Sequence, residues 1–460
     1  MILKKKEDKY DNWISASDWR YSSTIVGLYK YLTYTKSEFE YNEEFLKFHS
    51  EDITKEKFLL FVEDYYKEKL EHCQVENLLK KEFFNETEIK QINDLLTSRK
   101  YIKSLFASNL FDGKNKDIIL DIINKYRLEL IESSYINKKN MRDAFLDGSF
   151  FVENKTCRLK GYYIDAGKKS KSISYFFDNR TLNTSDSNWF EFIPFAFAGE
   201  YEWFFINDNI SIENLIRTNQ NYTTFLAETE DESKSKHVLF EKIQMASEFL
   251  NYDVEVIKKI YAKKDERSYY ETLFLRKTSI NTFKKLRDNK YLPFGAIDYD
   301  NLCKPIKIND EYLNTENIII EHILSNIYMD DFIEFLLKLE YKNDTYCYRI
   351  KDLISINFLI KRKDNAMRDA MKKTYATAKE VSEKIPENKV SGYKAKLINA
   401  LVSKDYEKFN QTILQLSNYS NVSFGFAYDL FEDFESNIDI AYTFVNSLNK
   451  KKVEKENINE

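Results

Sequence analysis

Cations and aromatic rings alternate over residues 258–290, and this interval offers the clearest chemistry in the sequence. It holds 11 Lys or Arg against 4 acids, although the whole chain has a formal net charge of −5. Clustered cations release counterions from a phosphate backbone, and aromatic rings stack on unpaired bases. The alternative is a solvated helix face with the rings turned inward. We favour a nucleic-acid contact, with the candidates Lys258, Lys259, Lys263, Lys264, Arg267, Arg276, Lys277, Lys284, Lys285, Arg287 and Lys290.

Two further groups of cations are candidates for the same chemistry. One lies at 361–373, where Arg368 and Lys372 are one helical turn apart. One face of this helix could therefore contact a phosphate backbone while the opposite face packs into a core. The other is a lysine cluster in a predicted loop. A plain solvated surface is the alternative for both. The candidates are Lys361, Arg362, Lys363, Arg368, Lys372 and Lys373, together with Lys168, Lys169 and Lys171.

Metal and catalytic motifs are weak throughout the chain. The four cysteines include no Cys-x-x-Cys pair, and His72-Cys73 has no second ligand pair at zinc spacing, so we expect ordinary helix residues there and no metal. Glu387 and Lys389 could be half of a nuclease site, but Glu-x-Lys arises by chance in a chain with 32% charged residues. We therefore expect no catalytic residues and no cofactor.

The elements that must position these residues are mainly helices. Gly is 9 and Pro 4 of 460 residues, far below usual shares of about 7% and 5%, which disfavours sandwiches and phosphate-cradling loops. Apolar residues recur at helical spacing over most of the chain, from the helices expected at 13–34 and 38–64 onward. The exception is a central segment of short aromatic and β-branched runs, including Trp189 to Ile206, which we predict to be a sheet.

The predicted fold class is therefore α+β and predominantly helical, with a small central β-rich segment and a C-terminal helical bundle. The longest apolar stretches have five and seven residues, whereas a membrane span needs about 20, so we expect a cytoplasmic protein with no membrane contact. The expected divisions are an N-terminal mostly helical region at 1–144, the β-rich segment at 145–210, a helical basic region at 211–312, the helical bundle at 313–449 and a solvated tail at 450–460.

Several scattered motifs together resemble one family. They are Ser17-Asp18-Trp19 with Thr24 to Leu28, Ile193 to Phe197, Phe204 to Asn209, Tyr393 to Leu401 and Ala441 to Val445. In order and spacing they resemble the large subunit of type I-B (Cst-type) CRISPR Cascade complexes. One departure is that the family's Cys-x-x-Cys-Gly knuckle corresponds here to Cys157-Arg158-Leu159-Lys160-Gly161, so a zinc site is expected to be absent at that place.

The resemblance implies a non-catalytic subunit that acts in antiviral defence. It would bind the 5′ end of the CRISPR guide RNA, recognise the PAM on target double-stranded DNA, help open the duplex and dock the helicase-nuclease effector. Its other partners would be the Cascade backbone and small subunits. Its C-terminal bundle resembles the small subunit, for which Met329 or Met367 would be an internal start.

A PAM reader needs a short polar element that enters a groove. A predicted turn and the residues after it supply the candidates Asn207, Asn209, Arg217 and Asn219. The alternative is a strand-to-helix cap, with Asn209 or Ser211 capping the helix and Asp208 complementing its dipole. Two other functions compete with the Cascade subunit: a metal-dependent nuclease of an anti-phage defence system, and a helical scaffold that binds only protein.

Overall fold

A computed structural model of the chain describes residues 9–138, 141–147, 157–162, 187–199, 202–229, 243, 244, 247, 250, 252–260, 269–308, 310–343 and 346–449. Two compact units divide the chain, and each contains two segments. Unit 1 comprises 1–228 and 254–274, and unit 2 comprises 229–253 and 275–460. The five divisions expected from the sequence remain a prediction.

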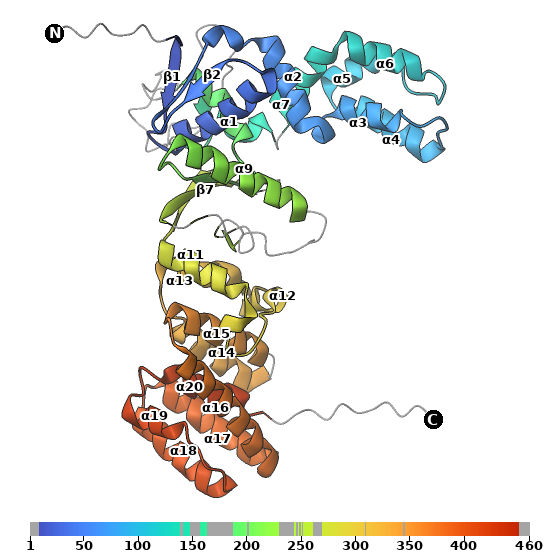
Figure 1. The fold of residues 1–460 in the computed structure, drawn as a ribbon. Helices are drawn as coiled ribbons and strands as arrows, with labels where there is room; N and C mark the ends of the chain where they lie inside the picture. The colour runs from blue at the N-terminus through green and yellow to red at the C-terminus, as the bar shows by residue number, and fades with distance from the viewer. Residues whose placement is uncertain are drawn as a thin grey trace, which may run out of the picture. The chain divides into compact units, whose positions relative to one another are not determined.

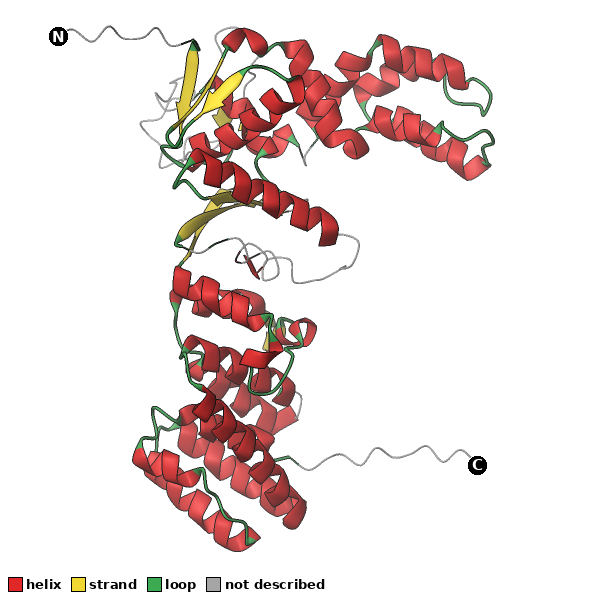
Figure 2. Cartoon of the chain, in the orientation of Figure 1, coloured by secondary structure: helices red, strands yellow, loops and turns green. Residues whose placement is uncertain are grey.

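Unit 1 combines helices with short strands (Figures 1 and 2). Its elements are β1 (Asn12–Ser15), α1 (Trp19–Thr35), β2 (Phe39–Tyr41), β3 (Phe45–Phe48), η1 (Ser50–Asp52), α2 (Lys55–Tyr66), η2 (Lys67–Lys69), α3 (Glu71–Leu78), α4 (Glu86–Leu96), α5 (Lys100–Phe106), α6 (Lys116–Lys125), α7 (Arg127–Asn137), α8 (Arg142–Phe145), β4 (Leu146–Asp147), β5 (Arg158–Leu159), the 3₁₀ helix η3 (Asn188–Phe195), β6 (Glu202–Asn207), α9 (Ile212–Thr229), β7 (Val254–Ile260) and β8 (Tyr269–Leu275). Its two three-stranded sheets have the orders β1-β3-β2 and β6-β7-β8.

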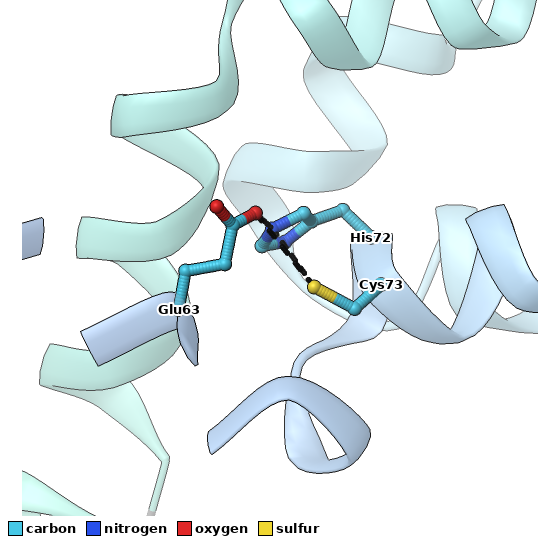
Figure 3. Close-up of side chains that lie close together, drawn as sticks. All are labelled: Glu63, His72 and Cys73. Atoms are coloured by element: carbon cyan, nitrogen blue, oxygen red, sulfur yellow. Dashed lines mark hydrogen bonds and ion pairs between the residues drawn. The ribbon is translucent and has the colours of Figure 1, made fainter. Parts of the chain in front are cut away.

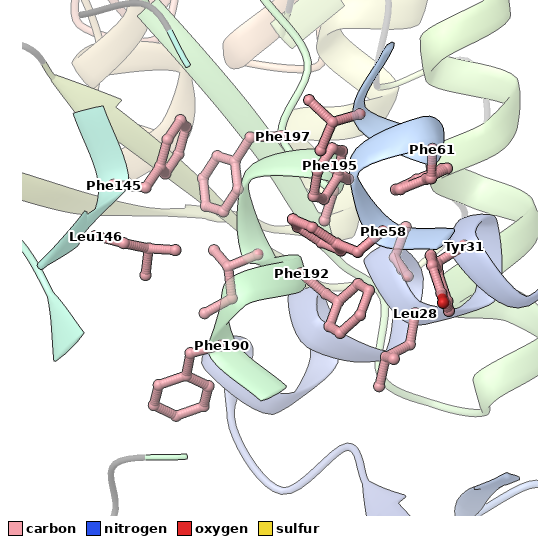
Figure 4. Close-up of a cluster of buried hydrophobic side chains, with 14 of the residues drawn as sticks. Leu28, Tyr31, Phe58, Phe61, Phe145, Leu146, Phe190, Phe192, Phe195 and Phe197 are labelled. Atoms are coloured by element: carbon pink, nitrogen blue, oxygen red, sulfur yellow. The ribbon is translucent and has the colours of Figure 1, made fainter. Parts of the chain in front are cut away.

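The main core of unit 1 forms where η3 packs on α1 and α2 (Figure 4). The ring of Phe192 lies 5.3 Å from that of Tyr31, and the ring of Phe195 lies 4.7 Å from that of Phe61. Gly27 permits this approach, because a Cβ there would lie 2.0 Å from the carbonyl oxygen of Phe192. The apolar motif at 193–197 therefore serves the core.

A second apolar cluster joins α3 to α7. It contains Val75, Ile92, Ile102, Ile119 and Leu130, all nearly inaccessible to solvent. Asn85 begins α4 with a capping box, in which its side chain accepts from the Glu88 N–H and Glu88 accepts from the Asn85 N–H. The two clusters meet in sequence at α3, where Cys73 belongs to the first and Val75 to the second.

Unit 2 is a helical assembly with one small hairpin. Its elements are α11 (Lys277–Leu286), η4 (Asn289–Tyr291), α12 (Tyr299–Leu302), β9 (Ile306–Ile308), β10 (Glu311–Leu313), α13 (Thr315–Ser325), α14 (Asp330–Asn343), α15 (Cys347–Ile360), α16 (Asn365–Lys384), α17 (Glu387–Val402), α18 (Tyr406–Ser420), α19 (Ala427–Glu432) and α20 (Ile438–Ser447). Almost every residue of α15 is buried, because α11, α12, α14 and α20 all pack against it.

A buried polar network holds α14, α15 and α20 together. The Lys361 ammonium donates to Asp330 at 2.9 Å and to Asp439 at 3.1 Å, and the Asn357 amide donates to the same two carboxylates. Asn357 also accepts from the Met329 N–H at 2.8 Å. A buried charge is tolerated only when it is paired and hydrogen-bonded, which this arrangement achieves.

The expected fold class, α+β and predominantly helical, is confirmed. Several elements differ from the sequence prediction. Strands stand where helices were expected at 39–41, 45–48, 254–260, 269–275 and 306–308, and the segment from Trp189 to Phe195 is a 3₁₀ helix where a strand was expected. Within the described part of the β-rich segment, only β4, β5 and β6 are strands. Each error concerns a short apolar run, which periodicity alone cannot assign.

Among the helices that the structure describes, none combines the length and the apolar character needed to cross a membrane.

Candidate nucleic-acid interface

The structure separates the cations of 258–290 into buried and exposed groups. Lys258 and Lys259 lie in the central strand β7 and are buried. The Lys259 ammonium donates to the Lys160 carbonyl at 2.6 Å and lies 4.0 Å from the ring centroid of Tyr270. These two lysines stabilise unit 1, and we leave them out of the interface. The candidates Lys263, Lys264, Arg267, Lys168, Lys169 and Lys171 lie outside the described residues.

On unit 2, α11 and the turn after it present most of the remaining candidates. Arg276, Lys277, Lys285, Arg287 and Lys290 are exposed. Lys284 is half-buried, and its ammonium donates to the Leu250 carbonyl at 2.9 Å. Asp288 forms an ion pair with Lys290 at 2.5 Å. The hydrogen bond in this pair raises the pKa of Lys290, so this lysine keeps its charge.

The N-terminal half of α16 lies against this turn, so two patches far apart in sequence form one surface. The guanidinium of Arg368 donates to the Lys290 carbonyl at 2.6 Å, and the rings of Phe294 and Tyr375 are 5.9 Å apart. We call the result the basic–aromatic surface. It comprises Lys285, Arg287, Lys290, Tyr291, Arg368, Lys372, Tyr375 and Lys379.

Two members of this surface were missed by sequence reasoning. Tyr375 and Lys379 continue the spacing of Arg368 and Lys372 by steps of three and four, so all four lie along one face of α16. The Lys379 ammonium lies 5.5 Å from the Tyr375 ring centroid, and the Lys290 ammonium lies 4.8 Å from the ring centroid of Tyr291. Extending the helical period past Lys372 would have found both residues.

The remaining candidates of the second patch have different surroundings. Lys361 belongs to the buried network of α14, α15 and α20, and the Lys363 ammonium donates to the Ser436 carbonyl at 2.6 Å. Arg362 is exposed and has a left-handed backbone with φ of 54°. Lys373 is exposed but points away from the face of Arg368 by its helical position. We leave Lys361 out of the interface because its charge is compensated within the protein.

The PAM-reading candidates divide in the same way. Asn207 is buried and its amide donates to Glu255 at 2.9 Å. Asn219 is buried and its side chain bonds both the N–H and the carbonyl of Ile206, which fixes β6 against α9. Asn209 and Arg217 are exposed. Only these two have side chains positioned to reach a ligand.

The alternative of a strand-to-helix cap is confirmed, and Ser211 is the capping residue. Its hydroxyl accepts from the Asn214 N–H at 3.1 Å. Asp208 is also buried, and it accepts from the Thr218 hydroxyl within the helix at 2.7 Å. Because Ser211 caps the helix, Asn209 is not needed as its N-cap.

Cys157 lies in a buried hydrogen-bonded group. Its thiol donates to Glu191 at 3.1 Å, and Glu191 takes two hydrogen bonds from Arg142 at 2.6 and 3.0 Å. Burial is the main cause that raises the pKa of Cys157, so the thiol keeps its proton.

Within the described residues, the one group of three potential metal ligands is Glu63, His72 and Cys73. Glu63 comes from α2 and the other two from the start of α3, so sequence spacing could not reveal the group. Glu387, the nuclease-like residue, begins α17, is exposed and belongs to no such group in the described chain.

The fold and its exposed chemistry define a class: a predominantly helical α+β protein that gathers cations and aromatic rings on one surface of unit 2. The chain matches the family of CRISPR-associated protein Csx8 in two matches, over residues 10–236 and 226–448, and it belongs to that family. The match confirms the CRISPR association implied by the resemblance. No curated protein and no solved structure matches the chain.

Proposed function

We propose that this chain is the non-catalytic large subunit of a type I CRISPR RNA-guided surveillance complex, as the resemblance to the type I-B (Cst-type) subunit implies. In this role it binds the 5′ end of the guide RNA, recognises the PAM on target DNA, helps open the duplex and docks the helicase-nuclease. The backbone and small subunits of the complex are its other partners. Membership of a CRISPR-associated family supports the proposal.

The basic–aromatic surface is the observation that carries it. Six cations line this surface, and two exposed tyrosines stand among them. Cations that contact a phosphate backbone do not have to recognise bases, because base pairing between the guide RNA and the target supplies the sequence specificity. The tyrosine rings offer stacking to unpaired bases. Because the whole chain has a net charge of −5, its overall charge does not attract nucleic acid. Binding is therefore expected at this local cluster of cations.

The test neutralises part of the surface and measures salt dependence. The variant Lys285→Gln, Arg287→Gln, Lys372→Gln should bind every DNA or RNA sequence more weakly to a similar degree. Its log–log slope of affinity against salt should become shallower by about 2 to 3, since each lost phosphate contact removes about 0.7–0.9. The matched control is Lys389→Gln, Lys396→Gln, Lys408→Gln, three exposed lysines on α17 and α18 of the same unit. An unchanged slope, or an equal change in the control, would contradict the proposed interface.

The role in a complex has its own test. Co-expression with the neighbouring genes should yield an assembly that contains this chain and a guide RNA. The purified chain should not cut nucleic acid with Mg²⁺. Cleavage that persists through purification would instead support the metal-dependent nuclease, and a partner that binds independently of salt and carries no RNA would support the protein-binding scaffold.

A further inference from the structure

Glu63, His72 and Cys73 bring one oxygen, one nitrogen and one sulfur atom to a single point in unit 1 (Figure 3). Glu63 Oε1 lies 2.9 Å from His72 Nε2 and 3.7 Å from Cys73 Sγ, and that sulfur lies 3.4 Å from the same ring nitrogen. The side chains of His72 and Cys73 are almost completely buried, and Glu63 closes the group from the facing helix.

These three distances suit a tetrahedral ion. Zinc binds His nitrogen and carboxylate oxygen at about 2.0–2.2 Å and thiolate sulfur at about 2.3 Å, so tetrahedral angles place its ligand atoms about 3.4–3.6 Å apart. Two of the three separations already have this size. The third, between Glu63 and His72, is a hydrogen bond that the ion would replace by widening it about half an ångström.

The local charge also favours a cation. Arg127 donates to Glu63 Oε1 at 2.5 Å and also to Glu76, so one guanidinium serves two carboxylates and one negative charge is left over. A Zn²⁺ ion bound to Glu63, to the His72 ring nitrogen and to the Cys73 thiolate, with the thiol proton released to solvent, would bring the group to neutrality. A mixed nitrogen, oxygen and sulfur set selects zinc over the oxygen-preferring Mg²⁺ and Ca²⁺.

We propose that Glu63, His72 and Cys73 bind a Zn²⁺ ion, with water as the fourth ligand. The ion would link α2, which belongs to the main core, to α3, which begins the second apolar cluster. It would thus fix the 3₁₀ helix η2, through which the chain passes from one cluster to the other. This site shares no residue with the group around Cys157 or with the basic–aromatic surface.

The first experiment is elemental analysis of the full chain, purified without chelators in a reducing buffer. Wild type should contain about one zinc ion per chain, and Cys73→Ser and His72→Gln should contain none above background. The matched control is Cys157→Ser, because Cys157 is also a buried thiol that donates to a glutamate paired with an arginine, but among the described residues it belongs to no group of metal ligands. The control should keep its zinc. Equal zinc in wild type and both site variants, or none in wild type after zinc is supplied, would overturn the proposal.

Cobalt tests the ligand set independently of zinc content. Co²⁺ added to the metal-free protein should give a thiolate-to-cobalt charge-transfer band and the intense visible bands of four-coordination. Cys73→Ser should lose the charge-transfer band while Cys157→Ser keeps it. A weak, six-coordinate spectrum in wild type would contradict a site with Cys73 as ligand.

The variant Arg127→Gln distinguishes a zinc site from a hydrogen-bonded cluster that binds no metal. Removing the guanidinium makes the group more negative, so zinc should bind at least as tightly and should restore the melting temperature lost by the substitution. If the cluster is held only by its own ion pairs, the variant should lose stability and zinc should restore none of it. That result would overturn the proposal while leaving the function of the basic–aromatic surface untouched.

Discussion

At the scale of single residues, the close approach of α1 and η3 depends on the missing side chain of Gly27. Its α-carbon faces the backbone of Phe192, where a methyl group has no room. Gly392, within α17, is the contrasting case, because a Cβ there would meet nothing within 4 Å. Two glycines that look alike in sequence therefore have opposite structural requirements.

Gly27→Ala should destabilise the protein by about 1–3 kcal/mol or more, because the added methyl must push η3 away from α1. Gly392→Ala should instead stabilise it by about 0.5–1 kcal/mol, because alanine leaves the unfolded chain fewer conformations than glycine does and so loses less entropy when the helix forms. Melting temperatures of the two variants, measured beside wild type, check both signs. Equal shifts in the same direction would contradict the packing described for Gly27.

Asp352 gives a prediction of pH dependence. Burial on α15 raises the pKa of its carboxyl from the ordinary 3.8 to about 6. The folded state therefore holds the proton more tightly than the unfolded state, so stability falls as the pH rises from about 4 to 6 and the full cost is present above pH 6. Asp352→Asn should raise the free energy of unfolding at pH 7 on the order of 2 kcal/mol.

This gain should shrink as the pH falls through 6 toward 4, because the folded carboxyl takes up its proton first and the unfolded carboxyl, with the ordinary pKa of 3.8, follows only near pH 4. Thermal melts between pH 4 and 7 would measure the change. Asp369→Asn, at an exposed position on α16, is the control and should show no such trend. A gain for Asp352→Asn that is independent of pH would mean that packing, and not charge, is its cause.

At the scale of elements, the junction between β6 and α9 separates a structural residue from a recognition candidate. Ser211 caps α9, whereas Asn209 is exposed and caps nothing. Ser211→Ala should lower stability by about 1 kcal/mol, as loss of an N-cap usually does.

Asn209→Ala together with Arg217→Ala should leave the melting temperature unchanged and weaken discrimination between PAM sequences in an assembled complex. Guide-RNA content should be unaffected. Binding to a panel of target duplexes that differ only in the PAM is the measurement. Full discrimination in this variant would move the search for the reader to the lysines at 168–171, which lie outside the described residues.

The sequence predicted elements well where the apolar period was long. The helical bundle predicted at 313–449, for example, begins with α13 and α14. It failed at β7, whose run Val254-Glu-Val-Ile-Lys-Lys-Ile lies between two strands and is buried on both faces. Such a strand lacks the alternation that marks a half-exposed one. Lysines also suggest an exposed position when only the sequence is known. In the structure, however, the carbonyl of Lys160 and the ring of Tyr270 make burial of Lys259 possible.

The same reasoning applies to the candidate sites. Local spacing could identify the cations of α11 and α16, because each helix carries its own pattern. It could not predict that Arg368 would reach the carbonyl of Lys290, since this contact depends on how distant helices pack. For the same reason it missed Glu63 as the neighbour of His72 and Cys73.

At the scale of the whole molecule, the two internal start candidates can be distinguished. A product from Met329 would retain α14 to α20 and the whole network around Lys361. A product from Met367 would lose α14, α15 and Lys361. Asp439 would then lose its cation, and α20 would lose α15, which packs against it, so this product should not hold its fold.

We therefore expect residues 329–460 to fold when expressed alone and residues 367–460 to aggregate or remain unfolded. Circular dichroism and size-exclusion chromatography of the two fragments would show this. Asp439→Asn in the shorter fragment is a useful control, because it removes the unpaired charge but not the exposed apolar surface of α20. A folded 367–460 fragment would contradict the central role given to α15.

The interleaving of the two units has a consequence for synthesis on the ribosome. Strand β6 ends at Asn207, but its partner β7 begins at Val254, and the intervening segment from Thr229 belongs to the other unit. Translation at about 5–20 residues per second delivers these last 50 or so residues in about 3 to 10 s. During that interval β6 has an unpaired edge, which is a template for pairing with another nascent chain. The rate of elongation, and not the stability of the finished sheet, therefore sets how long β6 can pair with a nascent chain on a neighbouring ribosome of the same messenger RNA.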